Sequence, residues 1–459
     1  MAAFPELITE AQASEERFLR QIFVRDQMAE WSKNPLLMAR AEGVHYWDHA
    51  GRRYLDALSG IYTVSVGHGN TRVIDAMTEQ LRKLHFSPPM HGTNPVAVQL
   101  ANLIAELSPG DLNTVKFESA GSEVTEAAIK IARQYHKLTG NPGRYKIISR
   151  YMSWHGSTLG SLSASGLKSR RTVNEPLAPG FLHVFPPTCY RCPFGKSYPD
   201  CGITCATIVN DVIEMEDPST VAAIMVEPIG HTGGIIDPPA EYLPILREVC
   251  DRHGILLIFD EIITGMGRTG QLFAAETFGV IPDVICTAKG LSGGFTPLSA
   301  MIVRQPIADV FWGPIAQNPG FVEGHTFEGN PVSCAAGIAV LREIVERDLC
   351  ANARHQGQRL RAGFAAIGAK YGIVGDLRGK GLLQGMEFVR DIRTKERFPA
   401  DPGIGVRIGR RALANGLLCR FDPHWLAFGP ALCVTDEQLD EMLALLDRSI
   451  GEVLDSDKL

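Results

Sequence analysis

Short apolar runs rich in valine and isoleucine alternate with helical patterns from about Val115 to Met301. Within this stretch, Ala222 to Pro228 is predicted as a buried strand, EYLPILREVCDRHG as a helix closed by Gly254, and Ile255 to Glu261 as the next strand. Such alternation is typical of strand–helix–strand units, and successive units build a parallel sheet. The sequence therefore predicts an α/β chain with a mostly parallel central sheet.

Two chemically reactive side chains fall at the carboxyl ends of predicted strands. Asp260 lies near the end of the run ILLIFDE, and Lys289 ends the short run VICTAK. The carboxyl ends of parallel strands share one edge of the sheet, where such folds bind ligands. We therefore expect Asp260 and Lys289 to lie close together, although a lone lysine at a strand end is usually a surface residue.

The two ends of the chain are predicted to form a smaller domain. After about Pro331 helical patterns predominate, with strand-like pieces around Gly381 to Val389 and Leu417 to Leu432. The first 60 or so residues hold a helical pattern and the strand pair HYWDHAGRRYLD, too little to bury a core alone. We expect a large domain over residues 66–330, a small α+β domain over 331–459, and an N-terminal segment, 1–65, packed on the latter.

Charge and hydropathy narrow the class of partner. The chain has 459 residues and a formal net charge of −6, so no basic excess draws it to nucleic acid or an anionic membrane. It has no uninterrupted apolar stretch of about 18 residues, and its N-terminus lacks a basic segment followed by an apolar run. These features favour a cytoplasmic enzyme with small-molecule partners.

A phosphate site is predicted near residue 120. The small residues Ser119 to Ser122 stand just before the amphipathic pattern EVTEAAIKIARQYHK. Free backbone amides and the dipole at a helix start can hold a phosphate group, and Gly121 would allow its close approach. The alternative is an ordinary helix start capped by Ser122, with Glu123 in the first turn. Alone, the segment leaves both interpretations open.

The run ILLIFDE also matches the acidic strand that holds magnesium in P-loop ATPases. That activity requires a phosphate loop of the form GxxxxGK[ST]. The nearest candidate is Gly195-Lys196-Ser197, and it would place the first glycine of the pattern at Tyr190. ATPase function is therefore discarded.

Lysine, carboxylate and phosphate site together match the needs of pyridoxal phosphate, which uses a Schiff-base lysine, a carboxylate at its ring nitrogen and a phosphate cradle. We predict Lys289, Asp260 and the pair Gly121 and Ser122 for these roles. An ionised Asp260 would keep the ring nitrogen protonated, so that the ring accepts electrons when a substrate C–H bond breaks. Lys289 would then carry the proton.

Six motifs carry a family resemblance: SAGSEVTEAAIKIAR, SWHGST, VEPI, DEIITGMGRTG, TAKGLSGGFTPLSA and HTFEGNP. In this order they resemble class III aminotransferases, and the likeness extends from about residue 60 to the tail GPALCVTDEQLDEM. The resemblance implies the type I fold of pyridoxal-phosphate transferases. It also implies a homodimer with shared active sites, with assembly to a tetramer left open.

The resemblance assigns further roles residue by residue. Trp154 and Ile262 would pack on opposite faces of the cofactor ring, and Glu227 would lie near the cofactor. Glu227 could equally be a structural ion-pair partner. Thr326 would reach across the dimer to the neighbouring subunit's phosphate, so an isolated monomer should lack part of its cofactor site.

Departures from the commoner family motifs indicate the substrate branch. Ile263 stands where the ornithine and 4-aminobutyrate members carry glutamine. An aliphatic residue at this position resembles the amine:pyruvate, or omega-transaminase, branch. Arg420, in GLLCRFDPHW, resembles the mobile arginine that binds a carboxylate and swings aside for an uncharged amine, and its alternative is a solvated surface arginine. Several members place an arginine where this chain has Ala427, so Arg420 is the main carboxylate candidate. Tyr62 and Phe86 would line the substrate pocket, although each could simply be core.

The predicted activity is a ping-pong omega-aminotransferase reaction, from an amine or omega-amino acid to a keto acid, with pyruvate as the expected acceptor. Related decarboxylating aminotransferases, which act on 2,2-dialkylglycines, also carry a tryptophan at the position of Trp154. A reaction that releases carbon dioxide is therefore one alternative. A catalytically silent binding protein on the same fold is another, and the intact pair Asp260 and Lys289 argues against it.

Four cysteines gather in CYRCPFGKSYPDCGITC, namely Cys189, Cys192, Cys201 and Cys205. Their spacing has the CxxC half of a zinc site and a looser CxxxC half. The favoured interpretation is a surface loop with incidental thiols. A zinc ion bound there would be structural.

Overall fold

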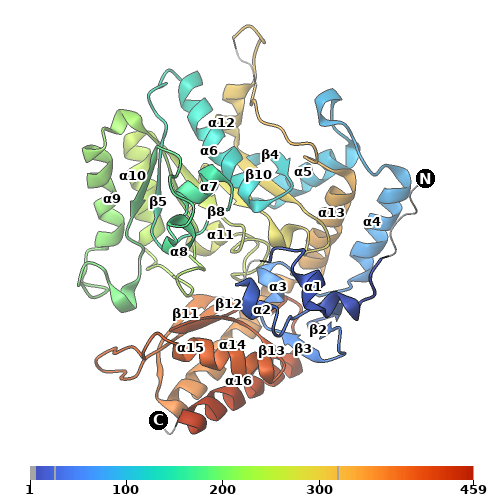
Figure 1. The fold of residues 1–459 in the computed structure, drawn as a ribbon. Helices are drawn as coiled ribbons and strands as arrows, with labels where there is room; N and C mark the ends of the chain where they lie inside the picture. Colours follow the sequence, from blue (N-terminus) through green and yellow to red (C-terminus); the bar gives the residue numbers. More distant parts are fainter. Residues whose placement is uncertain (1–6, 25–26, 318–319, 458–459) are drawn as a thin grey trace.

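The computed structural model describes residues 7–24, 27–317 and 320–457. Figure 1 shows a large lobe built around a central sheet and, below it, a smaller lobe that carries the C-terminus. The central sheet has seven strands in the order β4-β10-β9-β8-β7-β5-β6. Their bounds are β4 (Leu112–Glu118), β5 (Lys146–Arg150), β6 (Phe181–Val184), β7 (Val221–Val226), β8 (Leu256–Asp260), β9 (Val284–Thr287) and β10 (Ser299–Arg304).

The central sheet is parallel apart from one strand. β10 runs antiparallel to both of its neighbours, β4 and β9. The remaining adjacent pairs, from β9 across to β6, are parallel. The predicted α/β class with a mostly parallel sheet is therefore confirmed, and the antiparallel β10 is an addition that its apolar sequence did not announce.

Both faces of the central sheet are buried, which explains why its strands are apolar almost throughout. Leu257 and Ile285 belong to the core on one face, and their chain neighbours Ile258 and Cys286 belong to the core on the other. Successive strand residues point to opposite faces. Helix α6 (Gly121–Leu138) packs on the second face, whereas α10 (Tyr242–His253) contributes to the first core.

Helices α4, α5 and α13 complete the large lobe beside β4 (Figure 1). α13 packs on both α4 and α5, and α5 packs on β4. Their bounds are α4 (Thr71–Lys83), α5 (Pro95–Leu107) and α13 (Pro331–Glu346).

The smaller lobe holds an antiparallel sheet of four strands in the order β11-β12-β15-β14. Figure 1 shows its helices α14, α15 and α16 in orange to red. The strands are β11 (Val374–Lys380), β12 (Leu383–Phe388), β14 (Arg420–Asp422) and β15 (Trp425–Phe428), and the helices α14 (Leu349–Tyr371), α15 (Ile404–Ala414) and α16 (Asp436–Asp457).

The N-terminal strands β1 (Met38–Glu42), β2 (His45–Asp48) and β3 (Arg53–Asp56) share a sheet with β13 (Leu417–Leu418). β3 pairs with β13 in parallel, and the Arg53 guanidinium lies 2.6 Å from the Glu441 carboxylate on α16. The first and last parts of the chain therefore form one structure, while the proposed boundaries at residues 65 and 330 stay a prediction.

Arg268 ties three distant segments together next to the cavity described below. Its guanidinium donates to the backbone carbonyls of Leu382 and Pro430 and, at 3.1 Å, to the Ser59 hydroxyl. Burial lowers the pKa of this arginine to about 10. These bonds satisfy a buried cation that would otherwise be costly, and they fix the two lobes relative to each other.

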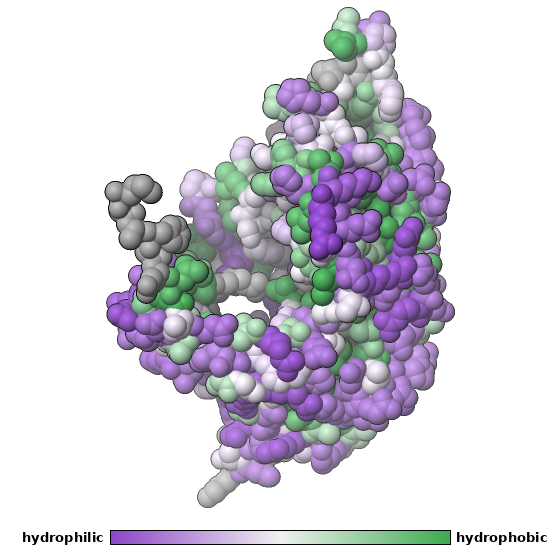
Figure 2. Space-filling model, turned by 90° about the vertical axis from the view of Figure 1, so that its right-hand side faces the viewer, coloured by the Kyte–Doolittle hydropathy of each residue, from purple (hydrophilic) through white to green (hydrophobic). Residues whose placement is uncertain are grey.

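The surface has one conspicuous projection. Residues 312–317, which follow η6 (Asp309–Phe311), project from the top of the large lobe in Figures 1 and 2, and green residues lie near the tip in Figure 2. Trp312 and Ile315 in this segment are 79% and 93% exposed. Among the described residues, no helix is both long and apolar enough to cross a membrane.

Candidate active site

A cavity of about 490 Å³ opens at the carboxyl edge of the parallel strands. It is lined by the segments that follow five of them: Ser119 to Ser122 after β4, Trp154 to Gly156 after β5, Glu227 after β7, Asp260 at the end of β8, and Lys289 after β9. The cavity therefore lies at the carboxyl edge of the sheet, where the alternating pattern of strands and helices predicts a ligand site. Asp260 and Lys289 do line the same cavity.

The carboxylate of Asp260 is held by two donors. His155 Nδ1 lies 2.7 Å from one carboxylate oxygen, and the backbone N–H of Ile262 donates to the other at 3.1 Å. A carboxylate only accepts, so His155 donates through Nδ1. Both side chains are buried, and the contacts fix the direction in which Asp260 faces the cavity.

The next residue, Glu261, has a different role. Its carboxylate accepts the backbone N–H groups of Ala274 and Ala275 at 2.6 and 2.8 Å, at the start of α11 (Ala274–Phe278). Burial raises the pKa of this carboxyl to about 7 against the effect of those bonds. Asp260 therefore faces the cavity, whereas Glu261 caps the start of α11.

Lys289 lies half-buried in the turn after β9. Its φ angle is +39°, a conformation that residues other than glycine seldom adopt. Lys289 lines both this cavity and the outer hollow described below. The turn therefore directs its side chain to the wall of the cavity rather than back along the strand.

The first turn of α6 forms the end of the cavity near Ser119. The Glu123 carboxylate accepts the amides of Ser119 and Ala120 at 2.9 and 3.1 Å. The helix begins at Gly121, so Ser122 is not the capping residue; its Oγ instead accepts the N–H of Ser157 at 2.9 Å. The amides of a first helical turn have no acceptor within the helix and can bind an anion.

Two close approaches shape this end of the cavity. A Cβ at Gly121 would come within 3.1 Å of Ile262 Cδ1, and one at Gly156 would come within 2.8 Å of Ser122 Oγ. Side chains at either glycine would fill or distort the space in front of the first turn of α6. Trp154 and Ile262, the residues predicted to pack on the two ring faces, both line the cavity.

Glu227 and His231 form a second buried pair on the cavity wall. His231 Nδ1 lies 2.9 Å from Glu227 Oε1, and the other Glu227 oxygen accepts the N–H of Trp154 at 3.4 Å. Burial opposes ionisation of Glu227, but the bond and charge of His231 outweigh it and lower the pKa of the carboxyl. Burial lowers the pKa of His231. Glu227 therefore lines the cavity and is also hydrogen-bonded to a buried histidine, so both interpretations of this residue stay open.

An outer hollow of about 480 Å³ adjoins the cavity and shares Trp154, His231 and Lys289 with it. Arg420 lines this outer hollow, with its guanidinium 5.3 Å from the ring centre of Trp425. The predicted carboxylate-binding arginine is therefore placed near the lysine but outside the inner cavity.

Tyr62 and Phe86 do not line either hollow within the described chain. Tyr62 is 1% exposed and packs behind the wall, with its ring centre 6.0 Å from that of His231. Burial raises the pKa of its hydroxyl to about 12. Phe86 packs edge-on against Phe327 at 5.9 Å between ring centres. In the single chain, the substrate-lining interpretation of these two residues is not met.

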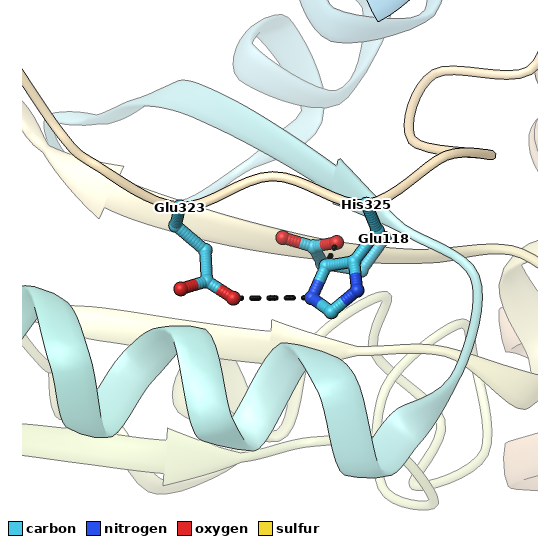
Figure 3. A group of neighbouring side chains, drawn as sticks. All are labelled: Glu118, Glu323 and His325. Atoms are coloured by element: carbon cyan, nitrogen blue, oxygen red, sulfur yellow. Dashed lines mark hydrogen bonds and ion pairs between the residues drawn. The ribbon is translucent and has the colours of Figure 1, made fainter.

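Thr326 is exposed, on the loop that leads into α13, and it does not line the cavity of its own chain. Its neighbour His325 lies 3.0 Å from Glu323 and 3.6 Å from the buried Glu118 (Figure 3). These three side chains could hold a metal ion by their spacing.

The charges beside this cluster argue for an anchor of the loop rather than a metal site. Lys116 lies 3.3 Å from Glu118, and Lys130 lies 2.6 Å from Glu323. Each carboxylate thus already faces an ammonium group, which a divalent cation would have to displace. The cluster holds the loop against β4 and α6, with Thr326 projecting outward.

Comparison with known proteins decides the family. A family model described as aminotransferase class-III matches residues 27–450. The chain belongs to this family. A probable aminotransferase of Mycobacterium tuberculosis is 40% identical over 84% of this chain and 82% of its own length. The putrescine–pyruvate aminotransferase of Pseudomonas aeruginosa is 33% identical, with 92% of each chain covered.

A solved relative extends the likeness to the whole fold. The structure of a thermostable (S)-enantioselective omega-transaminase from Thermomicrobium roseum superimposes with a TM-score of 0.91 at 34% identity, covering 98% of this chain and 100% of that one. The type I fold of pyridoxal-phosphate transferases is therefore confirmed. As a class III aminotransferase, the protein is a pyridoxal-phosphate-dependent enzyme whose substrates are an amine and a keto acid.

The cavity of this class III aminotransferase fits pyridoxal phosphate on its own chemistry. One end offers the open amides of α6 in front of Gly121, the floor carries an oriented carboxylate at Asp260, and Lys289 stands on the wall. Anion site, carboxylate and lysine are the three features that the cofactor requires.

Sequence reasoning missed two residues of this aminotransferase site, His155 and His231. His155 directly follows Trp154 in the SWHGST motif, so its position beside the predicted ring-stacking residue was a usable signal. His231 stands four residues after Glu227, but in a loop rather than a helix, and the sequence does not specify that they meet.

The four cysteines of the 189–205 segment all line one small hollow beside α9 (Thr204–Met215). They are free thiols. Within the described residues, no three of their sulfurs lie within 4.8 Å of one another. Zinc ligation would need closer sulfurs, because Zn–S bonds are about 2.3 Å long. The favoured interpretation of incidental thiols stays a prediction.

Proposed function

We propose that this class III aminotransferase is an omega-aminotransferase that moves an amino group from an amine or omega-amino acid to a keto acid, with pyruvate as acceptor. The observation that carries the proposal is the joined pair of hollows, one with Lys289 and Asp260, the other with Arg420. The named activities of the Pseudomonas and Thermomicrobium relatives support it.

Six residues of the inner cavity would hold different parts of the cofactor. Gly121 and Ser122 would bind the phosphate through the first turn of α6, and Trp154 and Ile262 would pack on the two faces of the ring. Asp260, oriented by His155, would keep the ring nitrogen protonated. Pyridoxal phosphate supplies an aldehyde for the amino group and a ring that accepts electrons.

Lys289 has two tasks in this proposal. Its amine would hold the cofactor's aldehyde end before the donor arrives. Once displaced by the donor, the same amine would take a proton from the substrate carbon that bears the nitrogen and return one in the second half-reaction. Such a positioned base typically contributes roughly 100- to 10,000-fold to the rate.

Arg420 would distinguish the two substrates that use the site in turn. Its guanidinium can bind the carboxylate of the keto acid through two N–H groups. When an uncharged amine enters, the guanidinium can remain over Trp425, where the structure places it. One site can thereby accept a charged and an uncharged molecule in alternation.

Dimerisation is part of the proposal. Thr326 faces away from the cavity of its own chain, as a residue that serves a neighbouring subunit must. The loop that bears it also exposes Phe327 and Val322, at 60% and 70%. Apolar exposure of this kind marks an interaction surface, and a second copy would cover it. The cytoplasmic location expected from the sequence stays a prediction.

The visible absorption spectrum of the protein with pyridoxal phosphate tests the proposal. We expect the yellow band of the bound cofactor to disappear when an amine is added and to return when pyruvate is added. A band that never forms would overturn the cofactor roles, and a band that no amine removes would overturn the omega-aminotransferase reaction. Release of carbon dioxide from a 2,2-dialkylglycine would favour the decarboxylating alternative.

A further inference from the structure

A second arginine lines the outer hollow. Arg170 lies on the short helix α8 (Lys168–Arg171), and the hollow that it lines also holds Arg420 and Asp422. The lining near Arg170 is mixed, with the polar residues Ser169 and Asn174 and the apolar residue Leu167. Two arginines and one aspartate thus line a space that opens from the reactive lysine.

Neither arginine is engaged by an acid within residues 7–24, 27–317 and 320–457, where no carboxylate lies within 4.0 Å of either guanidinium. Asp422 shares strand β14 with Arg420, yet burial raises the pKa of that carboxyl despite the arginine's charge. Half-buried guanidinium groups without an acidic partner are strong sites for an anionic ligand.

The two arginines lie at different depths. Arg420 acts electrostatically on His231, which lines both the outer hollow and the inner cavity. Arg170 belongs to an exposed helix, and its neighbours on the wall, Ser169 and Asn174, are themselves exposed. Arg420 is therefore the inner cation and Arg170 the outer one.

We propose that Arg170 is a distal anion subsite, which binds the acidic end of an omega-amino acid donor while its amine reaches Lys289. The inference rests on the proposed omega-aminotransferase activity and adds the residue that selects such donors over plain amines. Arg420 then serves the shorter keto acid, whose carboxylate lies next to the reacting carbon. A carboxylate and a sulfonate present the same oxygen acceptors to the guanidinium.

The subsite should act on binding rather than on the chemical step. The distal acid keeps its contact with Arg170 while bonds change near the other end of the donor. An interaction of equal strength before and during the reaction lowers KM and leaves kcat unchanged. A half-exposed, charge-assisted contact corresponds to roughly a tenfold change in KM.

The test compares chain-matched donors with the holoenzyme. The pairs are 4-aminobutyrate with butan-1-amine, 5-aminopentanoate with pentan-1-amine, and 6-aminohexanoate with hexan-1-amine. In Arg170→Gln we expect KM to rise about tenfold for the best omega-amino acid, with kcat unchanged and with the matched amine unaffected. Lys168→Gln is the control. It removes one positive charge from the same helix, but Lys168 does not line the hollow.

The outcomes separate the subsite from the activity on which it rests. An enzyme that uses the plain amines but shows no preference for any omega-amino acid would overturn the subsite alone. Equal losses in Arg170→Gln and Lys168→Gln would overturn it too, in favour of a general charge effect. If no amine reacts, the proposed function fails first. Comparing 3-aminopropane-1-sulfonate with 4-aminobutyrate then identifies the preferred anion.

Discussion

The inner cavity and the outer hollow differ in how their polar groups are held. In the cavity, Asp260 and Glu227 are buried, and each is paired with a histidine at 2.9 Å or less. In the outer hollow, Arg170 and Arg420 are half-exposed and have no acidic partner within the described chain. The fixed region suits chemistry common to all substrates, and the open region suits selection among them.

Removal of the lysine at the junction should have the largest effect. Lys289→Ala should lower the rate of amino transfer by up to roughly 10,000-fold, because no other described amine lines the inner cavity. Single-turnover absorbance changes with amine and then pyruvate would measure it. Retention of pyridoxal phosphate after gel filtration is the control for folding. Turnover near the native rate would remove Lys289 from the mechanism.

A smaller loss of activity is expected from Asp260→Asn, a substitution in the inner cavity. The amide cannot keep the ring nitrogen protonated, and it also loses the charged acceptor for His155 Nδ1. We expect kcat to fall about 100-fold and cofactor affinity to fall as well. Steady-state kinetics at saturating pyridoxal phosphate separates the two effects. A loss confined to cofactor affinity would contradict the proposed role at the ring nitrogen.

The outer region should be sensitive to acid through His183 on β6. Its Nε2 lies 3.2 and 3.1 Å from the carbonyls of Ala164 and Ser165, in the segment that leads to α8. Burial, with the charge of Arg171, lowers the pKa of His183 to about 4. The unfolded chain, with an ordinary histidine pKa near 6.5, takes up the proton first, so stability is lost as pH falls from about 6.5 to about 4.

The expected size of this loss is about 2 kcal/mol, reduced from the full linkage value because the ring is partly exposed. His183→Gln should flatten the dependence of the free energy of unfolding on pH in that window. Urea denaturation at several pH values would measure it. An unchanged slope in the variant would assign the acid sensitivity to other groups, such as the buried His231.

The smallest effect should come from the exposed loop. Thr326→Ala should weaken pyridoxal phosphate binding about tenfold if one hydrogen bond to the neighbouring subunit's phosphate is lost. Titration of the apoenzyme with cofactor, at protein concentrations above and below dimer dissociation, would measure it. If the native affinity does not depend on protein concentration, the cavity is complete within one chain and the shared-site proposal fails.

Much of the fold and the centre of the site could be predicted because they depend on local pattern. Continuous apolar strands predict a sheet buried on both faces, and that fixes Asp260 and Lys289 to one edge. The direction of β10 could not be predicted, since the run SAMIVR is equally apolar in either orientation. Its neighbours decide it, through pairing with β4 and β9.

The residues missed or misplaced depend on tertiary contacts. His155 meets Asp260 across 105 positions of sequence, and only the packed sheet edge brings them together. Ser122 looks like a cap by type, yet the capping position is Ala120, two residues earlier, and the Ser122 hydroxyl accepts a bond from the Ser157 N–H. Tyr62 was expected on the pocket wall by resemblance, but its side chain is buried and lines neither hollow.

The pairing of β3 with β13 has a consequence for how the chain is made. Leu55 pairs with His45 of β2 on one side, but its partner on the other side, Leu417, lies far later in the chain. The central sheet is less delayed, although β4 must still wait for β10. A nascent chain on the ribosome can therefore assemble the catalytic lobe while β3 still lacks β13 at its outer edge. Contacts so distant in sequence form slowly.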